Sequence, residues 1–363
     1  MRFNPTWFGF TLIGVAALAA IAYSSIEQQA DTTKGLATPA AAERPAAAKP
    51  AETVQRAADA PDAYTHYRVG NAAARTVYAD GAIMWVGTTM GLVRYDTGSG
   101  EHRYYDKRDG LPSDAILYAG KYGGRLMLGT HGGLSVFAPQ DGSWQHYGVA
   151  EGLPDARVFG ALAASNGDLW IATWAGATRV RGGLLGQRAE WRHHTVASTS
   201  GGLAGDRIYA VAEDRAGAIW FATQGGVSRY HRGKWTNWKG ATGPAAADAM
   251  SVVVTADGTV WVGTLGAGLG AFDGKGWRAY TAADGLPSDR VLALHADEAG
   301  GLWIGTDKGL ARFVKDKFSV LGPDEGLLGN SVYSIATPPD GTLWVGGNGG
   351  VAHIRKLAWR AAR

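Results

Sequence analysis

Few residues of this 363-residue chain combine the types and the spacing that catalysis needs. His193 and His194 offer two imidazoles, but neighbouring residues of a strand point to opposite faces, so this pair cannot bind one metal ion without distortion. Asp206 and Asp289 each stand beside an arginine, a pairing that a lyase or a hydrolase could use. The chain lacks the Gly-x-Ser-x-Gly, His-Glu-x-x-His and phosphate-binding glycine signatures. We therefore predict no catalytic residue, no bound metal and no cofactor, with a carbohydrate-active lyase or hydrolase as the alternative.

Binding is better represented than catalysis, because polar and aromatic residues vary at loop positions of an otherwise repetitive chain. A binding site on a symmetric scaffold has to come from such differences between copies. Trp174 lies in a turn, where its ring could stack on a sugar or grip a peptide beside acids and arginines. The candidate residues in turns are His131, Trp174, Gln224, Leu265, Asp307, Lys308 and Asn348. The candidates just before apolar strands are Asp114, Arg157, Asp206, Arg207, Asp289, Arg290 and Asn330.

Each of these residue types also has a purely structural explanation. Short Asp and Asn side chains stabilise turns by bonding backbone amides. The arginines could pair with neighbouring aspartates, and Trp174 could be a packed surface residue. The sequence therefore predicts where a site lies without separating binding side chains from structural ones.

One phrase occurs seven times between Trp85 and Trp344: a short apolar strand that ends in Gly-Thr or a close variant, a glycine turn and a second strand. Successive copies are 42, 43, 50, 41, 42 and 41 residues apart. A period in this range with strand-like units predicts an all-β fold, a β-propeller. The copies are Met84–Thr88, Leu126–Thr130, Leu169–Thr173, Ile219–Thr223, Val260–Thr264, Leu302–Thr306 and Leu343–Gly347.

Turn residues divide each copy into four strands. A glycine three residues before the tryptophan position, as in Asn166-Gly167, supplies the positive φ of a tight hairpin. The apolar segment upstream, such as Val291–Leu294, should be the innermost strand, buried on both faces. The aromatic segment downstream, such as Trp235–Trp238, should be the outer strand. In a propeller the outer-to-inner loops and the hairpins between second and third strands open on one face, so the candidate residues should surround one mouth of the channel.

The number of outer strands predicts how the ring closes. Each of the first six copies is followed by an outer strand, but the seventh runs into the C-terminal tail. The missing strand is Tyr64–Tyr67, whose sequence matches Trp144–Tyr147. We expect it to pair with Val351–Ile354 and close a seven-bladed ring without exposed edges. An eight-bladed or split arrangement is the alternative.

The loop phrase Asp109-Gly110-Leu111-Pro112, echoed at Glu151–Asp155 and Asp284–Asp289, adds a more specific signal. Together with Leu-Trp-Ile-Gly-Thr and Gly132-Gly133-Leu134-Ser135, it resembles the two-component regulator propeller repeat, over all seven copies. The resemblance implies the periplasmic sensing half of a membrane histidine kinase, in a family of which many members respond to glycans. The chain departs from that family in having no kinase, receiver, DNA-binding or immunoglobulin-like segment after the propeller. We therefore expect another polypeptide to supply the output.

The N-terminal part predicts export. Residues 1–26 contain an apolar run from Trp7 to Tyr23, preceded by Arg2, which could be an uncleaved signal anchor or a cleaved signal peptide. Residues 27–62 are rich in Ala and Pro and should be a disordered linker, and residues 63–363 should be the propeller. The expected location is the bacterial inner membrane with the propeller in the periplasm, or a secreted or periplasmic location if the signal is cleaved.

Composition excludes several partners. The chain has no cysteine, so disulfides, thiolate metal sites and a lipoprotein anchor are excluded, and its basic residues are scattered at a net charge of +3 without a nucleic-acid stripe. We expect a propeller that binds an extracytoplasmic glycan, peptide or envelope protein without chemistry, in a sensing context. The alternatives are a structural platform of an envelope complex and the lyase or hydrolase named above.

Overall fold

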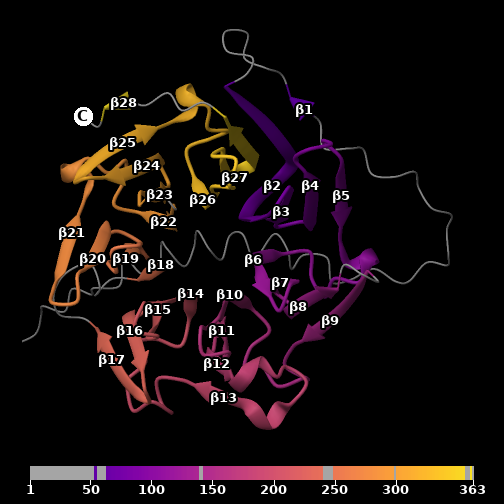
Figure 1. Cartoon of the computed structure of the whole chain (residues 1–363), viewed down its shortest axis with the longest axis vertical. Coiled ribbons are helices and arrows are strands. Elements are labelled where there is room, and N and C mark those ends of the chain that lie inside the picture. Colours follow the sequence, from indigo (N-terminus) through magenta and orange to yellow (C-terminus); the bar gives the residue numbers. More distant parts are fainter. Residues whose placement is uncertain are drawn as a thin grey trace, which may run out of the picture. The chain divides into compact units, whose positions relative to one another are not determined.

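The computed structural model describes residues 53–54, 63–138, 142–239, 248–297, 300–355 and 360–361. Its antiparallel strands form seven blades of four strands, arranged in a ring (Figure 1). The predicted seven-bladed β-propeller is therefore confirmed. The predicted N-terminal apolar helix and most of the linker lie outside the described residues. Within the described ranges, no helix has the length and apolar character needed to cross a membrane.

Five blades are separate sheets in which the chain runs from the innermost strand to the outermost. Blade 2 holds β6 (Ile116–Tyr122), β7 (Arg125–Thr130), β8 (Gly133–Ala138) and β9 (Ser143–Tyr147). Blade 3 holds β10 (Val158–Ala163), β11 (Leu169–Thr173), β12 (Gly176–Val180) and β13 (Trp191–His194). Blade 4 holds β14 (Ile208–Glu213), β15 (Ile219–Thr223), β16 (Gly226–His231) and β17 (Lys234–Trp238). Blade 5 holds β18 (Ala249–Val254), β19 (Val260–Thr264), β20 (Leu269–Phe272) and β21 (Trp277–Tyr280), and blade 6 holds β22 (Val291–Ala296), β23 (Leu302–Thr306), β24 (Gly309–Val314) and β25 (Lys317–Leu321).

Blades 7 and 1 share one long strand, β2 (Tyr64–Asp80), which closes the ring. Its first part pairs with the end of β27 (Leu343–Ile354), with Tyr64 opposite Ile354 and Tyr67 opposite Val351. Its second part is the innermost strand of blade 1, followed by β3 (Ile83–Thr88), β4 (Leu92–Asp96) and β5 (His102–Tyr105). Blade 7 begins with β26 (Val332–Ala336), and the long β27 serves as its second and third strands. The predicted closure by an N-terminal outer strand is confirmed.

The two ends of the described chain each add a short strand to an outer edge (Figure 1). β1 (Thr53–Val54) pairs with β2 at Tyr67 and His66, and β28 (Arg360–Ala361) pairs with β25 at Ser319 and Val320. These additions cover edge strands that would otherwise offer unpaired backbone groups.

Burial differs between the inner two strands of each blade. The second strands β11, β15, β19 and β23 are buried at every position. The innermost strands mix buried and half-buried residues: every residue of β14 after Ile208 is half-buried, whereas four of the five residues of β26 are buried. The prediction that innermost strands are buried on both faces is therefore wrong for β14 and confirmed only in part for β26, because these strands border the middle of the ring.

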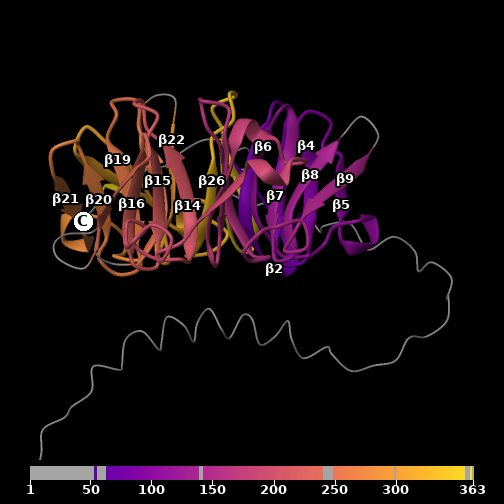
Figure 2. The same ribbon diagram turned by 90° about the horizontal axis from the view of Figure 1, so that it is seen from below.

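The core consists of seven clusters, one at each seam between neighbouring blades. Figure 2 shows the propeller from the side, with its strands crossing the thickness of the ring. Each seam cluster is built around four side chains, two from each of the blades that meet there. The first blade contributes a large residue of its second strand and the last large residue of its outer strand. The next blade contributes a residue near the end of its third strand and the outer-strand residue that pairs with it. At seam 4–5 the four side chains are Trp220, Trp238, Phe272 and Trp277. The matching sets at seams 1–2, 3–4 and 5–6 are Trp85, Tyr105, Phe137 and Trp144; Trp170, His194, Tyr230 and Trp235; and Trp261, Tyr280, Phe313 and Phe318.

The threonine that ends the repeated phrase locks the hairpin behind it. The Thr306 hydroxyl donates to the Gly309 carbonyl over 2.8 Å and accepts from the Lys308 amide over 3.1 Å. The same donor bond recurs in five other blades, from Thr88, Thr130, Thr173, Thr223 and Thr264. Thr306 is fully buried, and its bond to the Gly309 carbonyl is shielded from water.

A carboxylate ties several of the repeated tryptophans to an arginine of the third strand. Asp297 accepts from Trp303 Nε1 over 3.0 Å and from Arg312 over 2.7 Å. Blade 4 repeats this with Asp214, which accepts from Trp220 and forms an ion pair with Arg229. Burial by itself would raise the pKa of Asp297, but hydrogen bonds from the Gly301 amide and Arg312 outweigh it and lower that pKa.

Changing Thr306→Val should destabilise the propeller, because the change removes two hydrogen bonds of the hairpin, one of them buried, at nearly constant side-chain volume. We expect a loss of about 1 to 3 kcal/mol in the free energy of unfolding, measured by urea denaturation. The matched control Thr236→Val, at an exposed outer-strand position, should change stability by less than about 0.5 kcal/mol. Equal effects of the two changes would contradict the role assigned to the repeated threonine.

Asp297→Asn should lower stability at neutral pH by roughly 1 to 3 kcal/mol, because it removes the charge that pairs with Arg312. The lowered pKa means that the carboxylate stabilises the fold above its unfolded-state pKa of about 4, and that this stability is lost as the pH falls through the lower folded-state pKa. Thermal melts should therefore separate wild type and variant at pH 7 and bring them closer together at pH 3. Asp316→Asn, whose side chain is 74% exposed, is the control. A gap that stays constant from pH 7 to pH 3 would count against the ion pair.

Candidate functional site

The turns after the second strands and the loops before the innermost strands meet on one face, as predicted. The amide of Trp174 donates to the carbonyl of Arg157, and the amide of Gln224 donates to that of Arg207. Bonds also cross between blades, because the Gly176 amide of blade 3 donates over 2.7 Å to the carbonyl of Asp206, just before blade 4. The candidate residues therefore surround one mouth of the ring.

The Gly-Leu-Pro loops form part of this mouth and are packed against the core. A short 3-10 helix precedes the glycine in blades 1 and 5, at Lys107–Asp109 and Ala282–Asp284. Gly110 follows with a φ of 100°, a left-handed conformation that suits glycine. The leucine after the glycine is buried, with Leu111 3% exposed and Leu286 4% exposed. The repeated loop phrase thus anchors each crossover to the core.

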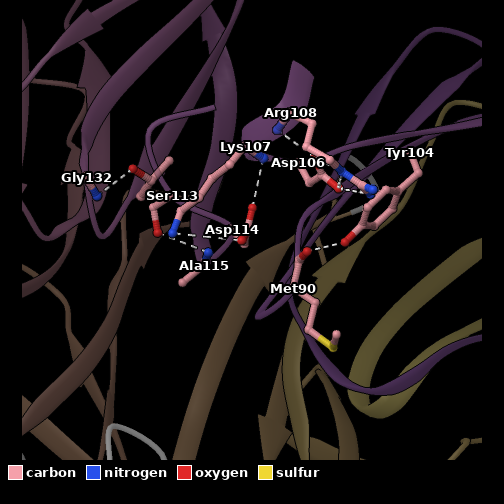
Figure 3. A network of polar contacts seen from close by, with 10 residues as sticks. Met90, Tyr104, Asp106, Lys107, Arg108, Ser113, Asp114, Ala115 and Gly132 are labelled. Carbon is pink, nitrogen blue, oxygen red and sulfur yellow. Dashed lines mark hydrogen bonds and ion pairs between the residues drawn. The ribbon is translucent and has the colours of Figure 1, made fainter. Parts of the chain in front are cut away.

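Three predicted site residues have a structural role in these loops. Asp114 accepts from the Lys107 amide over 2.9 Å (Figure 3). Asp289 accepts from the Ala282 amide over 2.7 Å, and Asp206 accepts from the Val196 amide over 2.7 Å. Since each carboxylate holds the start of its own loop, these three aspartates are explained without a ligand. This is the turn-stabilising alternative that the sequence left open.

Two of the three predicted arginines form ion pairs. Arg157 donates to Asp155 through two nitrogens over 3.0 Å each. Arg290 lies 3.1 Å from Asp307, in the turn of the same blade. His131 contributes to the field around Asp155, whose pKa is lowered although burial opposes this, because hydrogen bonds and the charge of Arg157 outweigh the burial. These residues form a charged rim in which the signs are largely balanced.

Trp174 is the centre of a cationic and aromatic cluster. The guanidinium carbon of Arg157 lies 4.3 Å from the ring centroid, and that of Arg207 lies 4.2 Å from it. The ring of Phe159 lies 5.5 Å from Trp174 and 5.7 Å from Tyr209. Blades 3 and 4 therefore bring two arginines and three aromatic rings together, and we call these five residues the mouth cluster. Trp174 itself is half-buried, so its ring is partly covered by this packing.

Arg207 differs from Arg157 in its electrostatic surroundings. Its charge acts on Asp248, just before blade 5, and lowers the pKa of that carboxyl, but burial of Asp248 has the larger effect and raises the pKa. The Arg207 guanidinium stacks on Trp174 and, in the described residues, forms no ion pair at close range with Asp248 or another carboxylate. It is therefore available to an anionic group of a ligand.

The sequence analysis missed the residues inside the mouth. In every blade the innermost strand changes register directly after its first paired residue, leaving one bulged residue outside the ladder. Bulged side chains of neighbouring blades are in contact in two places, where Arg75 lies 4.6 Å over the Tyr333 ring and Phe159 lies 5.7 Å from Tyr209. The available signal was variation, because the residue before the bulge is always Ala, Val or Ile whereas the bulged residue differs from blade to blade. The bulged residues are Arg75, Leu117, Phe159, Tyr209, Met250, Leu292 and Tyr333.

The remaining predicted site residues lie on the rim without joining the mouth cluster. Gln224, Lys308 and Asn348 are exposed in their turns, and Asn330 is exposed just before β26. Leu265 is bridged to Arg290 of the next blade. These side chains remain candidates for contact with a ligand that extends across the mouth.

The adjacent histidines of blade 3 point to different surroundings, as the strand geometry predicts. His193 Nδ1 lies 3.0 Å from the Thr178 hydroxyl. His194 packs against Trp170 and Trp235 in the seam cluster, and burial lowers its pKa to about 4. Over the described ranges, no group of three or more His, Cys, Asp and Glu residues is arranged to hold a metal ion.

A hollow with a volume of about 560 Å³ lies away from the mouth, between blades 5 and 6. It is lined by turn residues such as Asp257 and Asp273 together with Trp277 and Lys315. Both carboxylates are already used, because Asp257 accepts from the Thr259 amide and Asp273 from the Lys275 and Gly276 amides. Volume alone therefore does not make this hollow the better candidate, and the chemistry of the side chains favours the mouth cluster.

Comparison with known proteins gives structural and family matches. No curated protein matches the chain in sequence. The extracellular domain of a putative hybrid two-component system from B. thetaiotaomicron is 16% identical with a TM-score of 0.65, over 78% of this chain and 40% of that one. The chain thus spans less than half the length of this domain.

Two other similar structures match over nearly their whole length. A catalytically inactive variant of virginiamycin B lyase from Staphylococcus aureus, solved with quinupristin, is 13% identical with a TM-score of 0.66, over 81% of this chain and 99% of the lyase. YCF48 bound to D1 peptide is 14% identical with a TM-score of 0.60, over 82% of this chain and 98% of YCF48. At such low identities these matches show a shared fold.

The family match falls on the segments that the geometry singles out. Residues 202–225 and 285–308 match the family described as two component regulator propeller. Each match begins at a Gly-Leu loop, crosses the innermost and second strands and ends in the turn at the mouth. The chain is therefore a seven-bladed propeller, and two of its segments match the family described as two component regulator propeller.

Proposed function

We propose that this chain is the ligand-binding module of an extracytoplasmic sensing system, and that the mouth cluster binds a ligand carrying an anionic group. The ligand is a glycan or a peptide, and binding involves no chemical conversion. A separate signalling protein responds to the ligand-bound propeller. The proposal includes export through the N-terminal apolar segment, with the propeller tethered to the inner membrane or released into the periplasm.

The observation that carries the proposal is the placement of Arg207 against Trp174. An aromatic face and a guanidinium that forms no close ion pair within the described residues can receive a ring and an acidic substituent at once. The neighbouring rings of Phe159 and Tyr209 extend the apolar surface toward the middle of the ring. The sensing context is supported by the repeat family and by the likeness to an extracellular two-component domain.

Two alternatives have support of their own. The lyase in the comparison shows that a catalytic protein can have this fold, and the peptide complex shows that a propeller can bind a protein segment. A lyase or hydrolase would consume its ligand. A structural platform would retain a protein partner and bind no small ligand.

Arg207→Gln should weaken binding of an acidic ligand by about tenfold or more, because it removes the charge while keeping a polar side chain of similar reach. We suggest titrating the protein with tetragalacturonate, cellotetraose and tetraglutamate by calorimetry. Asp248→Asn should tighten the binding of the acidic probes, since it removes the carboxylate that competes for Arg207. Trp174→Ala should weaken the binding of every probe that stacks on the ring.

The matched control is Arg192→Gln, on the exposed outer strand of blade 3, which should leave binding unchanged. Mass spectrometry of each probe after incubation separates binding from turnover. Consumption of a probe would favour the enzyme, and absence of binding by all three would favour the platform. Equal binding by wild type and Arg207→Gln would overturn the role of the mouth cluster.

A further inference from the structure

Six of the seven seam clusters share a feature that the seventh lacks. In these six, the fourth side chain is an aromatic residue of the outer strand, opposite a residue near the end of the third strand. At seam 4–5 this residue is Trp277, whose ring lies 5.2 Å from Phe272, 5.7 Å from Trp238 and 6.5 Å from Trp220. The corresponding residues of five other blades are also aromatic: Trp144, Trp191, Trp235, Phe318 and Tyr64.

Blade 1 has a histidine at this position. His102 pairs with Tyr95 in the register that pairs Trp277 with Phe272. Its side chain is exposed, whereas the six aromatic counterparts are buried or half-buried. The fourth place of seam 7–1 is therefore not filled by the chain's own outer strand.

The other three members of this cluster are in place. The rings of Tyr67 and Trp344 stack with centroids 5.4 Å apart, and Tyr95 lies 4.8 Å from Tyr67 and 5.7 Å from Trp344. Beside them the structure has a hollow of about 300 Å³, lined by Tyr67, Tyr95, His102 and Trp344. Its lining shows that this hollow lies where the fourth aromatic ring packs at the other seams.

The rim of this hollow carries a positive charge. Arg355 lines it, and its guanidinium donates over 2.9 Å to the hydroxyl of Thr65, another lining residue. That acceptor is neutral, and within the described ranges Arg355 has no ion pair. A carboxylate beside the hollow would therefore gain a charge-assisted hydrogen bond.

We propose that seam 7–1 is a docking pocket for one aromatic side chain of a partner protein, with an adjacent carboxylate held by Arg355. The six filled seams show which occupant the pocket accepts, because each holds a Trp, Tyr or Phe against the same kinds of neighbours. This pocket is separate from the mouth cluster and does not depend on the function proposed for it.

The test uses the full chain and the dipeptide acetyl-(5-fluorotryptophyl)-aspartyl amide, followed by ¹⁹F NMR. The dipeptide should bind the wild type, with a fluorine signal that shifts and broadens. His102→Trp and His102→Phe restore side chains that other blades carry, so they should raise the melting temperature and weaken binding by about tenfold or more. His102→Ala is the matched control, which leaves the pocket open and should bind as the wild type does.

A second pair of measurements tests the charge. Arg355→Gln should weaken binding of this dipeptide but not of its counterpart with lysine in place of aspartate. In the Arg207→Gln background, at the mouth, His102→Trp and Arg355→Gln should weaken dipeptide binding as they do in the wild type, which separates this proposal from the proposed function. Equal binding by wild type and both filled variants, disappearance of these two effects in the Arg207→Gln background, or no binding to wild type at millimolar concentration would overturn the proposal.

Discussion

The packing of large, mostly aromatic side chains between neighbouring blades is the interaction on which the rest of the structure depends. Each second strand contributes one large residue that contacts the next blade, and in six of seven blades this residue is a tryptophan. The ring exists only if large residues pack at every seam and the last blade meets the first, which explains why β2 serves two blades. The hydrogen bonds of the repeated threonines stabilise the turns, and the buried leucines anchor the loops between blades. Together they keep the large residues in register. Apolar burial, the main source of stability in folding, is thus distributed evenly around the ring.

Function is expected where this repetition fails. The mouth cluster arises because blades 3 and 4 place an arginine before the innermost strand and a large ring at the bulge, a combination that the other blades lack. The open pocket at seam 7–1 arises because one outer strand carries His102 instead of an aromatic residue. In both places the scaffold supplies the geometry, and a few departures from the repeat supply the chemistry.

The architecture could be predicted from the sequence because the same strand-and-turn pattern occurs seven times. The period, the turn glycines and the match between Tyr64–Tyr67 and Trp144–Tyr147 were enough to predict the blades and the closing strand. The roles of individual loop residues could not be predicted, because an aspartate that holds an amide, such as Asp114, has the same sequence context as one that faces a ligand. The bulged residues Phe159 and Tyr209 were missed for another reason, since a register shift in a strand leaves no signature in the hydrophobic pattern. The open seam could not be predicted without the pairing register of the strands, which shows that His102 has the position in blade 1 that Trp277 has in blade 5.

Hydrogen–deuterium exchange of the full chain, with and without a saturating acidic ligand, tests the central claim most directly. If the site lies where blades 3 and 4 depart from the repeat, the amides of the turn Trp174–Gly176 and of the loop around Arg207 should exchange more slowly when the ligand is bound. The corresponding turns of blades 1 and 7 should exchange at the same rate in both states. Protection that appears only on outer strands, or uniformly in all seven blades, would contradict the account.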